Sequence, residues 1–219
     1  MSSLPLILAS GSPRRRAFLH ALGLDFSVCA ADIDETPLPN ELPAALARRL
    51  AVAKASAVGA IIEAPALILA ADTVVALEGT LLGKPLDAAD AHAMLTALRG
   101  RDHHVVTAIS LLHNGSGEQR TLVNDTLVSM RLYTNQEIDG YIATGDPFDK
   151  AGGYAIQHAT FRPVVAMNGC FASVMGLPLG DLQTLLAAFG LIFNASLPLI
   201  CAEAGAERCC QSSNMAQMG

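Results

Sequence analysis

The stretch LPLILASGSPRRRAFL, Leu4 to Leu19, joins an apolar run to a Gly-Ser-Pro turn and three consecutive arginines. The apolar run predicts a short buried strand over residues 4–9. Ser12 and Pro13 are typical of the N-cap and first position of a helix, which we expect to end near Gly23. A strand followed directly by a tight turn and a helix is the first indication of an α/β fold.

The rest of the chain continues to alternate between strand and helix patterns. Strands are expected over 26–33, 66–77, 104–113 and 121–133, with short candidates at 154–157, 163–167 and 172–174, and helices over 42–58, 87–98, 134–144 and 179–189. This alternation predicts an α/β class with one main domain over residues 1–190. The periodicity fades beyond Gly190, so we expect residues 191–219 to form a loosely ordered C-terminal tail.

Composition excludes several classes of protein. Hydrophobic residues make up 52% of the chain and charged residues 16%, which argues against disorder. A net charge of −6 argues against a nucleic-acid-binding protein, which normally needs a basic face. The longest apolar stretches fall short of the ~20 residues that cross a bilayer, so no membrane span is expected. Positive charges follow the first apolar run, which is the reverse of a signal peptide.

The cysteines favour a reducing compartment. There are five, an odd number, at irregular spacing and without a CxxC pair. Metal ligation by thiolates is therefore not expected, and reduced thiols in a cytoplasmic protein are the simpler interpretation.

The three arginines leave two interpretations open. Only 14 lysines and arginines are present, and three of them are consecutive. Arg14 and Arg15 fall in the first helical turn, where a positive charge opposes the helix dipole at a cost of ~0.3–1 kcal/mol. They either point to solvent or hold an anion, such as a polyphosphate, at the helix N-terminus.

Asp72 is the second unusual residue, because it interrupts an otherwise apolar strand. An unpaired buried carboxylate is costly, so Asp72 should lie at an accessible position or beside a cation. A structural salt bridge, a metal ligand and a general base all remain possible roles. Lys84 and Lys150, each in a loop, are not specific signals alone, and no Walker A, GxGxxG, GxSxG or HExxH motif occurs.

Several short motifs occur together in a fixed order. They are LASGSPRR (8–15), DE (34–35), KA (54–55), ADTVV (71–75), GKP (83–85), DKAGGYAIQ (149–157), NGC (168–170) and VMGLPL (174–179). In combination they closely resemble the Maf nucleotide pyrophosphatases, over roughly residues 4–189. The segment 158–161 departs from the glycine-rich sequence of many members, and the residues after Phe189 find no match.

This resemblance implies a Maf/inosine-triphosphatase-like fold, an elongated mixed sheet flanked by helices, with two lobes around a central cleft, usually in a homodimer. It also implies hydrolysis of a nucleoside triphosphate to the monophosphate and pyrophosphate with a divalent metal, Mg²⁺ or Mn²⁺. The roles that it implies for single residues are as follows: Asp72 as the catalytic proton acceptor, Ser12, Arg15, Lys54 and Lys84 as triphosphate ligands, and Glu35 with Asp72 as metal ligands.

The resemblance further implies that Arg14, Thr73 and Gln157 determine the choice of substrate. Their combination is similar to the dTTP/UTP branch of the family, whereas a branch acting on methylated GTP would carry Trp and Gln at the first two positions. The leading hypothesis is therefore a dTTP/UTP pyrophosphatase. The alternatives are the same chemistry on modified nucleotides, and a regulatory module that binds nucleotides or nucleic acid without catalysis.

Overall fold

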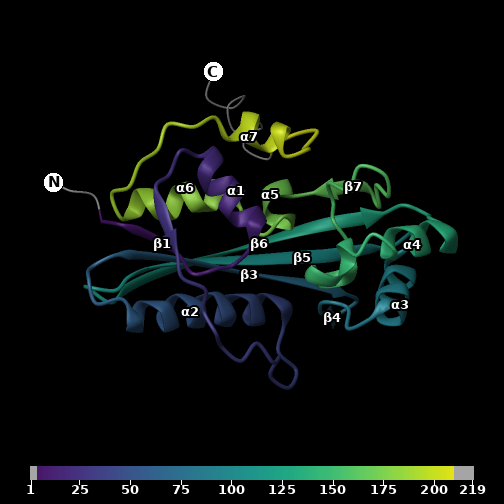
Figure 1. Cartoon of the computed structure of the whole chain (residues 1–219), viewed down its shortest axis with the longest axis horizontal. Helices are drawn as coiled ribbons and strands as arrows, with labels where there is room; N and C mark the ends of the chain where they lie inside the picture. Colours follow the sequence, from purple (N-terminus) through teal and green to yellow (C-terminus); the bar gives the residue numbers. More distant parts are fainter. Residues whose placement is uncertain (1–3, 210–219) are drawn as a thin grey trace.

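The computed structural model describes residues 4–209, which are built around one mixed β-sheet (Figure 1). Its strands are β1 (Leu6–Leu8), β2 (Phe26–Val28), β3 (Leu67–Leu77), β4 (Thr80–Leu82), β5 (Asp102–His113), β6 (Glu118–Met130) and β7 (Val164–Asn168). The strand order is β2-β1-β3-β5-β6-β7, and β4 pairs with β3. β1 runs parallel to both of its neighbours, while the β3–β5, β5–β6 and β6–β7 pairs are antiparallel. The predicted α/β class with a mixed sheet is confirmed.

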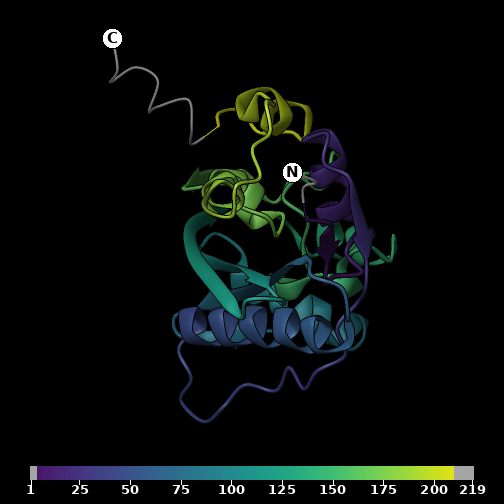
Figure 2. The ribbon, with the colours of Figure 1, turned by 90° about the vertical axis from the view of Figure 1, so that its left-hand side faces the viewer.

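Helices cover both faces of this sheet. They are α1 (Pro13–Ala21), α2 (Pro43–Ile61), α3 (Ala88–Leu98), α4 (Asn135–Ile142), α5 (Phe171–Val174), α6 (Leu179–Ala188) and α7 (Leu197–Glu203), with the 3-10 helices η1 (Asp146–Asp149) and η2 (Ala151–Gly153). Figures 1 and 2 show α2 along one face, α1, α5 and α6 on the other, and α7 outermost.

The buried side chains form separate clusters at the two ends of the sheet. One cluster packs α1, α6 and α7 against β1 and the first part of β3. Another packs α3 and α4 against the far ends of β3, β5 and β6. Each end of the sheet therefore has its own core, which is consistent with the two lobes that the resemblance implies.

Alternation along β3 assigns its residues to opposite faces. Leu69 packs in the cluster on the α1 side, whereas Ile68 and Ala70 pack on the side covered by α2. Asp72 continues the series of Ile68 and Ala70, and Thr73 continues the series of Leu69. Two adjacent polar residues of the strand thus point to opposite sides of the sheet.

The edge of β3 that faces β1 and β4 is interrupted in its middle. β1 pairs only with Leu67–Leu69, and the backbone N–H of Ala9 donates to the carbonyl of Leu69 at 2.7 Å. β4 pairs only with Val75–Leu77. The segment 70–74 lies between these two pairings, so side chains from both faces of the sheet can reach the same space beside it.

Some local expectations differ from the structure. The second strand is shorter than residues 26–33, and residues 154–157 form no strand. Residues 172–174, a strand candidate, belong to α5 instead. Short apolar runs fit a buried strand and a buried helical turn equally well, so their pattern alone does not separate the two.

The region after Gly190 also differs from the expectation of a loosely ordered tail, as far as residue 209. It contains α7, whose Leu197, Ile200 and Cys201 are buried in the cluster with α1 and α6. Burial of these apolar side chains stabilises a helix that has no amphipathic repeat long enough to be detected in the sequence. Residues 210–219 lie outside the described part of the chain.

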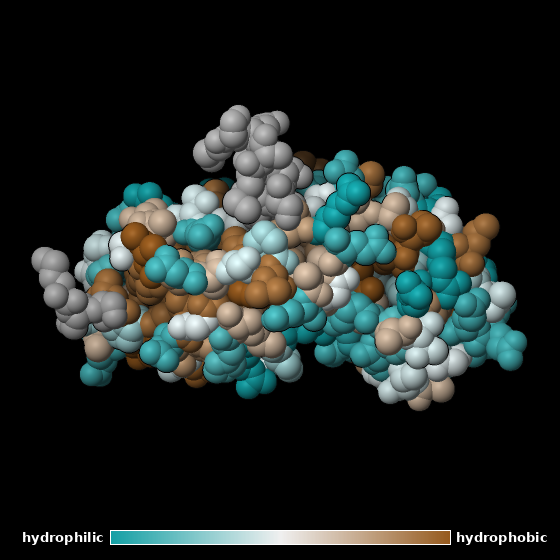
Figure 3. Space-filling view, turned by 90° about the horizontal axis from the view of Figure 1, so that it is seen from above, coloured by the Kyte–Doolittle hydropathy of each residue, from teal (hydrophilic) through white to brown (hydrophobic). Residues whose placement is uncertain are grey.

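The surface on the α1, α6 and α7 side is mixed in character. Figure 3 shows hydrophobic and hydrophilic side chains interspersed over this face, without one dominating area. Among the described residues, the helices are too short or too polar to cross a membrane.

Candidate active site

A cavity of about 410 Å³ lies beside the interrupted edge of β3. It is lined by every residue that the sequence analysis singled out for the site: Ser12, Arg14, Arg15, Glu35, Lys54, Asp72, Thr73, Lys84 and Gln157. These side chains come from α1, α2, β3 and three different loops. The fold therefore brings together residues that are far apart in the sequence, as the prediction of a single site requires.

The start of α1 forms one wall of the cavity. Ser12 is the N-cap, and its hydroxyl accepts from the backbone N–H of Arg15 at 3.5 Å, with Pro13 in the first turn. The predicted cap is confirmed. The three arginines then separate: Arg14 and Arg15 line the cavity and are half-buried, whereas Arg16 is exposed.

Arg15 is held by protein groups on three sides. Its Nε donates to the carbonyl of Gly176 at 2.8 Å, Nη1 donates to Ser10 Oγ at 2.9 Å, and Nη2 donates to Thr73 Oγ1 at 3.4 Å. A guanidinium has five N–H donors, so these contacts leave two to face a ligand. Burial lowers the pKa of Arg15 to about 10, which still leaves it charged at neutral pH. It is therefore a fixed cation at the base of the cavity.

Asp72 is paired with a lysine from α2. Asp72 is only 6% exposed, and its Oδ1 lies 2.6 Å from Lys54 Nζ. Lys54 comes one helical turn after Leu50 and one before Val58, both buried, so the α2 periodicity carries it to the same face. Burial raises the pKa of Asp72 above its ordinary value, while the charges of Lys54 and Arg15 act in the opposite direction.

Glu35 contacts the same ammonium group. Its Oε1 lies 2.7 Å from Lys54 Nζ, so the carboxylates of Glu35 and Asp72 flank one cation. Within residues 4–209 no cluster of three or more His, Cys, Asp or Glu could hold a metal by itself. Mg²⁺ and similar hard cations are commonly bound by one or two carboxylates together with substrate phosphates. These two residues fit a cation that binds with a phosphate ligand.

Lys84 reaches the cavity from the loop after β4. The backbone N–H of Gly152 donates to the carbonyl of Gly83 at 2.9 Å, which ties this loop to η2. Gly152 has a φ of +72°, and a Cβ there would lie 3.0 Å from Val75 Cγ1. Any larger residue would therefore be strained and crowded at this position. The glycine pair seen in the sequence supports the position of Lys84.

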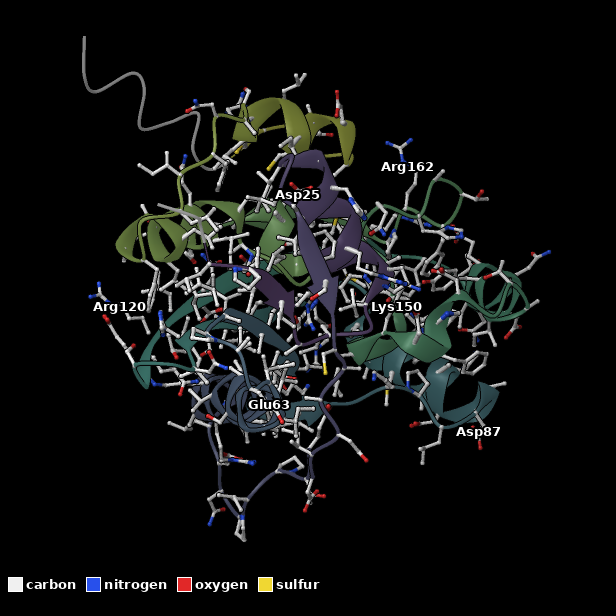
Figure 4. All side chains as sticks on the ribbon, turned by 60° about the vertical axis from the view of Figure 1, so that its left-hand side comes forward. Asp25, Glu63, Asp87, Arg120, Lys150 and Arg162 are labelled. Atoms are coloured by element: carbon white, nitrogen blue, oxygen red, sulfur yellow. The ribbon has the colours of Figure 1, made fainter. Side chains whose placement is uncertain are left out.

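Lys150, which the sequence analysis left without a role, supports the opposite wall. Figure 4 shows it in the interior between the N-terminal ribbon and the α3–α4 lobe, while Asp87 and Arg162 lie at the periphery. Lys150 Nζ donates to Asp146 Oδ1 at 2.9 Å and to Asp149 Oδ1 at 2.5 Å. The other oxygen of Asp149 lies 3.4 Å from Arg14 Nη1. Lys150 is thus engaged by carboxylates and helps to place the partner of Arg14.

The outer part of the cavity borders the C-terminal segment. Gln157 is exposed at the cavity, and a Cβ on Gly205 would lie 3.8 Å from its Cβ. A second cavity of about 390 Å³ shares Arg14 and Met175 with the first and is also lined by Ile200 of α7. Residues beyond the predicted domain therefore lie close to two of the residues expected to select the substrate.

Comparisons with known proteins identify the family of this chain. The family model described as "Maf-like protein" matches residues 5–189. The chain belongs to the Maf family. A protein named dTTP/UTP pyrophosphatase from Thermomicrobium roseum is 47% identical over 204 residues, covering 90% of this chain and 91% of the relative. Another of the same name, from Pelotomaculum thermopropionicum, is 42% identical over 185 residues, covering 84% and 96%.

A solved structure also shows a weak similarity to this Maf protein. It is the nucleoside-triphosphatase / dITP/XTP pyrophosphatase of Mycobacterium abscessus, with a TM-score of 0.38 and 18% identity over 58% of this chain and 74% of that chain. A similarity of this size does not bear on the function of this Maf protein.

The sequence analysis missed the residues that hold the Maf site together. Gly176 supplies a carbonyl to Arg15, and Thr107 lies behind Thr73 with their hydroxyl oxygens 2.9 Å apart. A signal for Thr107 was present, because it interrupts an apolar strand as Asp72 does. Gly176, with a φ of +98°, falls inside the recognised VMGLPL motif, but the motif alone does not show that its carbonyl is the functional group.

Proposed function

We propose that this Maf protein hydrolyses dTTP and UTP to the monophosphate and pyrophosphate. The observation that carries the proposal is the single cavity lined by Arg15, Lys54, Lys84 and Asp72. The names of the relatives add the substrate, since proteins 47% and 42% identical to this chain are named dTTP/UTP pyrophosphatases. Three cations and a carboxylate that line one cavity suit a polyphosphate ligand and a base that activates water.

The reaction requires a water molecule to attack the α-phosphorus while the bond from that phosphorus to the bridging oxygen breaks. Asp72 accepts the proton of the attacking water, and pyrophosphate leaves with the bridging oxygen. Arg15 and the N-terminus of α1 bind phosphate oxygens, and Lys84 offsets the charge that develops on the leaving group. Because Arg15 is already fixed by protein contacts, little reorganisation is needed when substrate binds.

We also propose that a divalent cation, Mg²⁺ or Mn²⁺, binds with the substrate at Glu35 and Asp72. When bound, such an ion polarises phosphate oxygens and neutralises their charge. Lys54 occupies the position between the two carboxylates, so the lysine and the incoming cation compete for the same oxygens. We further propose that the protein is a cytoplasmic homodimer that does not bind nucleic acid. Light scattering tests the homodimer.

The test is release of pyrophosphate from a panel of common and modified nucleoside triphosphates, with and without divalent metal. We expect dTTP and UTP to be hydrolysed well and ATP and GTP poorly. A clear preference for GTP would contradict the assignment, and a preference for modified pyrimidine nucleotides would favour the alternative substrate class. Binding without release of pyrophosphate would indicate a regulatory module.

A further inference from the structure

A chain of hydrogen bonds runs from the cavity into the core behind Thr73. Arg15 Nη2 donates to Thr73 Oγ1 at 3.4 Å, and Thr73 Oγ1 lies 2.9 Å from Thr107 Oγ1. Thr107 Oγ1 in turn lies 2.8 Å from the carbonyl oxygen of Ser173 in α5. Thr107 and Ser173 are fully buried, whereas Thr73 is half-buried and lines the cavity.

The direction of each bond in this chain follows from the chemistry of its ends. A carbonyl oxygen only accepts, so the single proton of the Thr107 hydroxyl points to Ser173. Thr107 must then accept from Thr73, whose own proton is consequently directed into the core. The opposite direction would leave the Thr107 oxygen and the Ser173 carbonyl as two facing acceptors at 2.8 Å, which is unfavourable in a buried site.

We propose that Thr107 is a positioning residue that keeps the Thr73 hydroxyl proton away from the nucleotide. Thr73 then offers the cavity only a lone pair. Its substrate partner is a donor, either the ring N–H of a thymine or uracil base or a hydroxyl of the sugar, and not a phosphate oxygen. The proposal rests on the proposed function and adds the chemical group that Thr73 selects.

Strand pairing makes this arrangement rigid. Thr73 and Thr107 are directly opposite each other in the antiparallel β3–β5 pair, so their side chains share one face of the sheet. Beside it, a Cβ on Gly176 would lie 3.2 Å from Thr73 Oγ1, so a glycine at this position avoids crowding the hydroxyl. Reorienting the Thr73 proton therefore requires removal of its acceptor.

The test compares Thr107→Val and Thr107→Ser with the wild type on dTTP and two analogues. N3-methyl-dTTP lacks the ring donor, and 2′,3′-dideoxy-TTP lacks the sugar hydroxyl. In the wild type, the analogue that lacks the partner of Thr73 should lose roughly tenfold or more in kcat/KM. In Thr107→Val the loss of kcat/KM on this analogue should largely disappear, because the Thr73 hydroxyl is no longer held as an acceptor. Thr107→Ser keeps a hydroxyl at this position and should restore the loss.

Two further variants separate this role from a structural one. Thr73→Val removes the other end of the same bond and should also abolish the analogue effect, which keeps the test valid if Thr107→Val does not fold. Ser110→Ala removes another buried hydroxyl of β5, one that bonds to Thr121 outside the cavity, and should leave the analogue ratios unchanged.

Three results would overturn the inference. The first is an equal loss of kcat/KM on both analogues in the wild type and in Thr107→Val. The second is no loss of kcat/KM on either analogue in the wild type. The third is a Ser110→Ala variant with the same analogue ratios as Thr107→Val. A wild-type protein that hydrolyses neither dTTP nor UTP would instead contradict the proposed function itself.

Discussion

The inner and outer parts of the cavity are built differently. The floor, which we define as Arg15, Lys54 and Asp72, is held by hydrogen bonds and ion pairs at 2.6–3.4 Å from α1, α2, β3 and the turn after α5. The rim, defined as Arg14 and Gln157, is more open to solvent. Within residues 4–209, Arg14 forms one ion pair, with the exposed Asp149 at 3.4 Å.

This difference separates two tasks. All nucleoside triphosphates carry the same triphosphate, so a rigid floor suits the reaction common to them. The base differs between substrates, and side chains at an open rim can change without disturbing the core. The floor should therefore determine the rate, and the rim together with Thr73 should determine the ranking of substrates.

The largest expected effect is the loss of the carboxylate at the floor. Asp72→Asn should reduce kcat by ~10²–10⁴-fold, because it removes the proposed base. Burial raises the pKa of Asp72 in the folded protein, so its contribution to stability is present at low pH and lost as the pH rises through that pKa. A neutral Asn should therefore not lower the Tm at neutral pH, with Glu35 still paired to Lys54. Activity near the wild-type level would exclude Asp72 from the mechanism.

Adjacent arginines give the sharpest test of the comparison. Arg15→Ala should reduce kcat/KM by ~10²–10³-fold, because it removes a preorganised donor to the phosphates. Arg14→Ala should reduce it by less than ~10-fold, since its ion pair is exposed and such pairs contribute little, but it should change the ranking of dTTP, UTP, dCTP and GTP. Steady-state kinetics on these nucleotides checks both. Equal losses in the two variants, with an unchanged ranking, would show that floor and rim do not differ in function.

The sequence was sufficient for those parts of the site that depend on local or periodic patterns. Ser12 and Pro13 define the start of α1 through their own backbone preferences, and the spacing of apolar residues along α2 indicates that Lys54 is near the buried face. Asp72 was detectable because a charged residue within an apolar strand needs a partner. These signals require no knowledge of distant residues.

The supporting contacts could not be predicted in the same way. Arg15 and Gly176 are 161 positions apart, and a carbonyl group leaves no mark in the sequence. The pairing of Thr73 with Thr107 depends on the register of β3 and β5, which is set by the whole sheet. α7 was missed because a helix of seven residues is stabilised by burial against α1 and α6 and not by its own pattern.

A smaller effect is expected on the pH dependence of the floor. Because burial raises the pKa of Asp72, the acidic limb of kcat/KM should lie above the ordinary aspartate range. Lys54 opposes that rise, so Lys54→Met should move the limb to still higher pH. Profiles between about pH 4 and pH 9 measure the limb directly. Lys84→Met is the matched control, because it removes a cavity lysine that forms no described ion pair with Asp72, and it should lower kcat/KM without moving the limb.

The smallest effect on catalysis is expected at α7, although its effect on stability is substantial. Ile200 is 7% exposed, and Ile200→Ala should destabilise the protein by about 2–5 kcal/mol through the lost burial and the cavity left behind. The adjacent Leu199 is 59% exposed, so Leu199→Ala should leave the Tm nearly unchanged. Residues of α7 line the second cavity beside Arg14 of the rim, and none of them lines the active-site cavity. For this reason kcat for dTTP should stay close to the wild-type value in both variants at a temperature where both are folded. Thermal unfolding and single-temperature kinetics measure the two quantities separately. A large loss of kcat in Ile200→Ala without unfolding would mean that α7 acts on the floor, and the separation between a fixed floor and an open rim would then be wrong.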